Sequence, residues 1–210
     1  MEVDFNAIND VTSFWDESEK IIKVAENIQY AMVVPAISEL RYAGRRLIDY
    51  LWAVQKELGE TAAREAIEDF KQCCIRARHD AVDTTVAYID EYMSQISQSV
   101  GLAIVAEYAP DFQKLRPLVT KMSNDISVSR ADRLRRIDIY NKLIDTKDGL
   151  SEFDKMIEIF QKVRDSEQLM EASKMRQERN RTIYKAAVAF GFAGTSLFAI
   201  STFFLLKEVF

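Results

Sequence analysis

The sequence predicts an all-α fold, an antiparallel helical bundle with long helices that is followed by one C-terminal transmembrane helix. Only six Gly and three Pro occur among 210 residues, whereas residues that favour helices are abundant. No segment alternates apolar and polar residues in the manner of a strand, and one long stretch near the C-terminus is uncharged. A chain of this length can bury one sizeable core or two small ones without disulfides or metals.

The first two predicted helices lie on either side of Pro35. A helical spacing of apolar residues runs from Thr12 to about Val33, and Thr12 or Ser13 is a suitable N-cap. Pro35 suits the first turn of a second helix, which Gly59 ends. We expect these two helices to form a hairpin or a sharply bent pair.

The clearest helical pattern of the body runs from Thr61 to Gly101. One apolar face persists for about 40 residues, so this helix needs helical partners along its length. The apolar segment that follows it, Leu102 to Val105, is far shorter than the roughly 20 residues that span a bilayer, so we expect it to be part of the core.

Two shorter helices are predicted next. Pro117 marks the start of one that fades through residues 123–125, and Ser129 caps another that ends near Gly149. Ser151 and the carboxylate three residues later have the spacing of a capping box, which predicts the last helix of the body.

The apolar stripe of that last helix ends at Val163, and a largely polar segment follows. We therefore divide the chain into four parts: a cytoplasmic helical domain (1–163), a polar juxtamembrane stalk (164–185), a transmembrane helix (186–206) and a short tail on the far side (207–210).

The predicted transmembrane helix contains no charged residue from Ala186 to Leu206. At 1.5 Å per residue it reaches about 31 Å, which matches the hydrocarbon core of a bilayer. A buried helix at the end of the chain is the alternative. Basic residues precede the segment, and no secretory signal begins the chain, so the positive-inside rule predicts a cytoplasmic body; these basic residues are Arg176, Arg179, Arg181 and Lys185.

This helix has a stripe of small and hydroxylated side chains. Gly191, Thr195 and Thr202 fall within about 40° on a helical wheel, and Gly194 and Ser201 widen the arc. Such a stripe allows close helix packing, which is one interpretation.

The other interpretation is an ion pore. In an assembly of four or more copies, Thr195, Ser201 and Thr202 would line a polar path together with Gly191 and Gly194. Phe198 lies close to that path and is a candidate hydrophobic gate.

Enzymatic chemistry is not expected. His79 is the single histidine, and the chain has no glycine-rich phosphate loop, nucleophile elbow or zinc-ligand spacing, so we predict no cofactor and no metal. His79 is expected to be a satisfied surface or core residue. The adjacent Cys73 and Cys74 cannot bridge without strain, so we expect free, buried thiols.

Clustered arginines are candidates for binding a phosphate backbone or an anionic headgroup. The candidates are Arg130, Arg133 and Arg136, which share one face of a predicted helix, and the pair Arg45 and Arg46. The alternative for the first three is a solvated face that is paired with Asp132 and Asp138.

A helical body, one terminal spanning helix, the run Gly194-Thr195-Ser196 and the pair Ser201-Thr202 together resemble the transmembrane effectors of Hailong-type bacterial antiphage systems. The resemblance implies an oligomeric ion channel of the cell inner membrane with a pore rich in Ser and Thr. It also implies a pore that is held closed by single-stranded DNA oligomers, which a partner nucleotidyltransferase makes.

Two other functions fit the same layout. One is a tail-anchored coiled-coil scaffold or tether that binds a protein partner, for which the hydroxyls of the last helix would be dispensable. The other is a holin-like toxin that disrupts membranes without a defined pore.

Overall fold

The structure is a computed structural model that describes residues 5–132, 134–145 and 149–207, with side-chain burial given for residues 9–186 of these ranges and for Val188. Every element in these ranges is a helix, and they contain no strand. The predicted all-α class is therefore confirmed.

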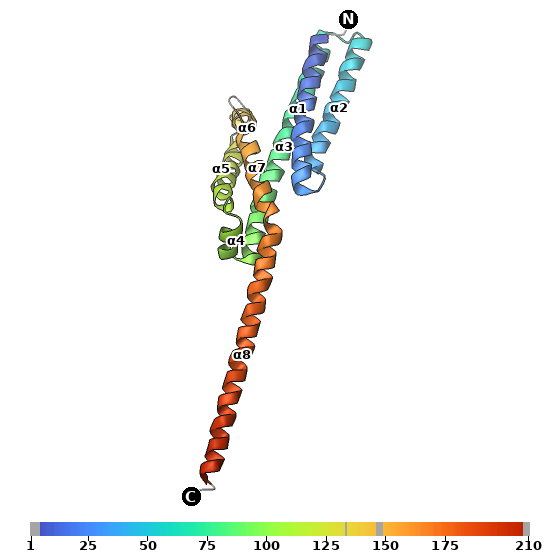
Figure 1. Cartoon of the computed structure of the whole chain (residues 1–210). Coiled ribbons are helices and arrows are strands. Elements are labelled where there is room, and N and C mark those ends of the chain that lie inside the picture. Colours follow the sequence, from blue (N-terminus) through green and yellow to red (C-terminus); the bar gives the residue numbers. More distant parts are fainter. Residues whose placement is uncertain (1–4, 133, 146–148, 208–210) are drawn as a thin grey trace.

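Three long helices form one side of the body: α1 (Phe5–Gln29), α2 (Val34–Gln55) and α3 (Glu60–Val100). They run in alternating directions, and both α1 and α2 pack mainly against α3 (Figure 1). Pro35 lies in the first turn of α2, as predicted. Thr12 and Ser13 lie inside α1 and are not caps, because the helix already includes Phe5.

The long helix α3 has helical partners along its length, as the sequence predicts. Its N-terminal half packs on α1 and α2 around Phe70, and its C-terminal half packs in a larger cluster with the later helices. Gly59 and Gly101 flank α3 with φ of 99° and 87°, which glycine adopts without strain.

Four shorter helices lie on the other side of α3: α4 (Leu102–Tyr108), α5 (Phe112–Ala131), α6 (Arg136–Ile144) and α7 (Glu152–Asp165) (Figure 1). The capping box at the start of α7 is confirmed, because Ser151 accepts from the Asp154 amide at 3.0 Å and Asp154 accepts from the Ser151 amide. The prediction that the segment from Leu102 to Val105 is core is confirmed for Ile104 and Val105, which are buried, and is wrong for Leu102, which is 59% exposed.

Two predicted helix boundaries are wrong. Pro117 lies inside α5, because buried residues continue across it and their burial outweighs the backbone hydrogen bond that proline cannot donate; they are Phe112, Leu115, Val119 and Met122. Ser129 is a buried residue of α5 and caps no helix, since its hydroxyl donates to the Ile126 carbonyl at 2.7 Å.

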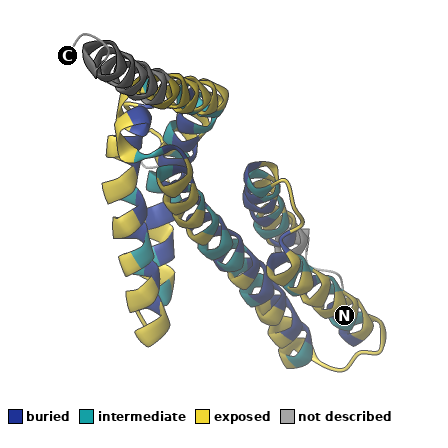
Figure 2. Cartoon of the chain, turned by 90° about the horizontal axis from the view of Figure 1, so that it is seen from below, coloured by how far each residue is buried: buried dark blue, intermediate teal, exposed yellow. Residues whose placement is uncertain are grey.

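The last helix, α8 (Glu167–Lys207), extends from the body as one continuous helix (Figure 1). Its residues up to Ala186 are largely exposed, whereas buried residues follow one side of the body helices (Figure 2). Met170 is fully buried, so the first turn of α8 still belongs to the core.

Candidate functional site

The junction between α7 and α8 connects the body to the helix that carries the predicted pore. Arg164, in the last turn of α7, donates to the Ile28 carbonyl of α1 at 3.1 Å. Its guanidinium also lies 4.9 Å from the ring centroid of Tyr30 and 5.4 Å from that of Phe160. One side chain therefore links the end of α7, just before α8, to the end of α1.

Tyr30 itself has an unusual backbone. Its φ of 50° is in the left-handed region, which costs free energy for a residue with a Cβ. The contact with Arg164 helps to hold this turn between α1 and α2, where the ring of Tyr30 is otherwise largely exposed.

A second contact joins α8 to α3. The Tyr92 hydroxyl donates to Glu167, the first residue of α8, at 2.9 Å, and Tyr92 packs edge-on against Phe160. Burial, and then the neighbouring Glu167 carboxylate, raise the pKa of Tyr92 above its usual range, so the hydroxyl stays protonated and donates. Sequence patterns gave no sign of the Arg164 and Tyr92 contacts, because the partners are far apart along the chain.

The predicted pore residues lie within the helical backbone of α8, and the structure describes nothing of them beyond that backbone. This holds for Gly191, Gly194, Thr195, Phe198, Ser201 and Thr202. Within the described part of the chain, no helix is both long enough and apolar enough to cross a membrane. The transmembrane helix at 186–206, the pore stripe and the gate therefore stay predictions.

The predicted arginine patch is divided between two helices. Arg130 lies in α5 and Arg136 in α6, so they do not share one helix face, and Arg133 lies outside the described residues. Arg130 pairs with Asp83 of α3 at 2.8 Å, rather than with the expected Asp132 or Asp138.

Tyr140 is the centre of this region. Its hydroxyl donates to the same Asp83 carboxylate, Arg136 lies 5.8 Å from its ring centroid, and its ring stacks on His79 at 3.7 Å between centroids. Burial and the nearby Asp83 raise the pKa of Tyr140 to about 12. Anion binding by Arg130 therefore competes with an existing ion pair.

His79 is a core residue, which is one of the two locations that the sequence predicted. The prediction that its hydrogen bonds are satisfied is wrong. His79 is 4% exposed, and its Nδ1 atom has no hydrogen-bond partner within the described chain. Burial lowers its pKa to about 3, with further lowering by Arg136 and Arg78, so the ring is neutral near pH 7. The sequence around His79 gave no sign that its ring stacks on Tyr140, which lies on α6.

Arg45 and Arg46, the other predicted anion-binding residues, lie on α2 and are already paired. Both contact Asp49 at 3.2 Å, and Arg46 also contacts Asp69 of α3 at 3.4 Å. These pairs are partly exposed, so each contributes little to stability and can rearrange.

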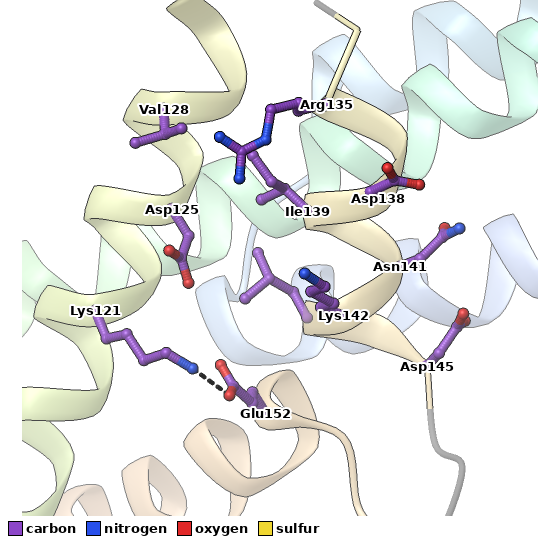
Figure 3. A pocket seen from close by; sticks show the side chains of 11 residues that line it. Lys121, Asp125, Val128, Arg135, Asp138, Ile139, Asn141, Lys142, Asp145 and Glu152 are labelled. Carbon is purple, nitrogen blue, oxygen red and sulfur yellow. Dashed lines mark hydrogen bonds and ion pairs between the residues drawn. The ribbon is translucent and has the colours of Figure 1, made fainter. Parts of the chain in front are cut away.

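A groove of about 1040 Å³ lies between α5, α6 and the start of α7 (Figure 3). Lys121 of α5 and Glu152 of α7 form an ion pair at one end of it. Its wall contains four carboxylates but only three basic side chains, Lys121, Arg135 and Lys142, so its charge does not favour a polyanion.

Other kinds of chemistry have little support in the described residues. They contain no group of three or more His, Cys, Asp or Glu side chains that is suited to a metal ion. Cys73 and Cys74 are free and buried, as predicted, and burial raises the pKa of Cys74 to about 11, which disfavours the reactive thiolate.

Comparison of the chain with protein-family models, with curated proteins and with solved structures gave no match.

Proposed function

We propose that the chain is a single-pass membrane protein that assembles from four or more copies into an ion channel, with its helical body as the regulatory part. The observation that carries the proposal is the continuity of α8, which joins the core at Met170 to the uncharged residues 186–206 without a helix break. One helix per copy encloses a pore only in an oligomer, and the hydroxylated stripe supplies a polar lining.

The body is well placed to control such a pore. Tyr92 of α3 contacts Glu167, the first residue of α8, and Arg164 fixes the end of α7, just before α8, to the end of α1. A rearrangement of α1 or α3 would therefore tilt or rotate α8 as a lever, since a helix of this kind transmits motion as a rigid element.

Single-stranded DNA oligomers from a partner nucleotidyltransferase, acting in antiphage defence at the inner membrane, are the closing ligand that the resemblance implies. Arg45 and Arg46 are the best candidates to meet phosphate, because their partner Asp49 is more exposed than Asp83, the partner of Arg130. Binding would then fall steeply with salt concentration, as counterion release requires. Affinity that does not depend on salt would reject this part of the proposal.

The experiment that tests the channel is a current measurement on the purified full chain in planar bilayers, together with the copy number in detergent. Discrete currents from an assembly of four or more copies are expected. A monomer or dimer, or an assembly that passes no current in any ligand state, would overturn the proposal.

A tail-anchored scaffold is the second candidate, because α2 exposes large apolar side chains such as Ile48, Leu51 and Trp52. It predicts binding of a protein partner without ion currents.

A further inference from the structure

The exposed face of α2 has the pattern of a second packing seam. One face of α2, with Ala43, Tyr50 and Ala53, is buried against α3. On another face, Gly44 and Leu51 are seven residues apart, and Ile48 lies between them four residues after Gly44. This alternation of four and three residues is the spacing by which a helix packs against another helix.

Gly44 is the clearest sign that something approaches this seam. Glycine inside a helix costs about 0.5–1 kcal/mol relative to alanine. The space beside Gly44 is open, so packing within the chain does not require the missing side chain. A helix or groove of another molecule would use this position for close contact.

The apolar side chains at the seam are large and solvent-exposed. Ile48 is 50% exposed, Leu51 47% and Trp52 61%, and Leu58 after the end of α2 is 63% exposed. Together they offer on the order of 400 Å² of apolar surface, about half of what one partner buries in a standard interface. A charged rim would supply the remainder.

The groove on the other side of α3 is a complementary surface. Val128 of α5, which is 46% exposed, and Ile139 of α6 both line it, together with the carboxylates of Asp125 and Asp138 (Figure 3). Three of its eleven lining residues are apolar, Val128, Ile139 and Leu143, and these would contact the seam of α2. The carboxylates suit Arg41, which follows the same seam of α2 and is exposed.

We propose that α2 of one copy docks in the groove between α5 and α6 of the next copy. The helix α2 and the pair α5 and α6 lie on opposite sides of α3 (Figure 1). One chain cannot fill its own groove, so every copy keeps one donor and one acceptor surface. Repetition of such a head-to-tail contact gives a ring when the rotation between copies closes and an open filament when it does not, and a pore requires the ring. The inference rests on the proposed oligomer and specifies how it is built.

The test uses the full chain in detergent, with Trp52→Glu on the α2 side and Val128→Glu on the groove side. Each variant is expected to convert the assembly to monomers. A 1:1 mixture of the two is expected to give dimers and nothing larger, because only one intact pair of surfaces remains. Tyr42→Glu, an exposed site on α2 outside the seam, is the matched control and should assemble as the unmodified chain does.

Assembly of Val128→Glu as in the unmodified chain, or a mixture that stays monomeric, would overturn the proposed contact. A second experiment does not rely on disrupting the assembly: Trp52→Cys and Val128→Cys are combined in one chain. Oxidation should then link neighbouring copies by disulfides into a ladder of bands, and the native Cys73 and Cys74 do not interfere because they are buried. Absence of the ladder also overturns the contact. If the unmodified chain assembles through this contact but passes no ion current, the channel is rejected and the contact stands. If the Val128→Glu variant still assembles and passes current, the contact is rejected and the channel stands.

Discussion

Replacement of Arg164 by Ala removes three contacts at the end of α7, just before α8 begins. The guanidinium donates to the Ile28 carbonyl at 3.1 Å and stacks on Tyr30 and Phe160. A hydrogen bond from a charged donor contributes about 1.5–3 kcal/mol, and each cation–π contact about 0.5–1 kcal/mol. Since these terms overlap, we expect Arg164→Ala to lower the free energy of unfolding by about 2–4 kcal/mol.

For a chain of this size, such a loss lowers Tm by roughly 5–10 °C. Thermal unfolding of the full chain in detergent, followed by circular dichroism, measures it. Hydrogen exchange should also accelerate in the last turn of α1, where the Ile28 carbonyl loses its partner. Lys162→Ala is the matched control on α7, because Lys162 is exposed and pairs with the exposed Glu158 of the same helix. Equal Tm values for the Arg164 and Lys162 variants would refute the reasoning.

Three further predictions concern the body. His79 is neutral in the folded protein and takes up a proton in the unfolded chain below pH 6.5, so the free energy of unfolding should fall by about 1 kcal/mol per pH unit from pH 6 to pH 4. His79→Phe should flatten this slope when unfolding is measured at a series of acid pH values. An unchanged slope would contradict the neutral, buried histidine. Ser151→Ala should cost about 1 kcal/mol through loss of the capping box, measured by denaturant unfolding, whereas no change would reject its role. Cys73 and Cys74 should resist alkylation at pH 8 until the body unfolds, and rapid labelling of the folded chain would contradict their burial.

Local signals predicted the long helices well. The apolar face from Thr61 onward and the flanking Gly101 correspond to α3 and its end, and the capping box at Ser151 was confirmed. These features depend on residues a few positions apart, so the sequence carries them directly. Pro117 misled because burial along α5 outweighed a local helix breaker.

The candidate site depends on contacts that sequence spacing does not encode. Arg164 meets Ile28 across 136 positions, and Tyr140 meets Asp83 across 57. The arginine patch was placed on one helix because no local signal marked the break between α5 and α6. Conversely, the hydroxylated stripe of α8 is a property of the sequence alone, and its role stays a prediction.

The most direct test of the channel is the single-channel current of a variant that lacks the predicted pore hydroxyls. Thr195→Val, Ser201→Ala and Thr202→Val are combined in the full chain, and Ser196→Ala, which lies off the stripe, is the matched control. We predict that the triple variant still assembles but loses the current or changes its conductance, whereas Ser196→Ala conducts as the unmodified chain does. Unchanged conductance in the triple variant would contradict a pore lined by these hydroxyls.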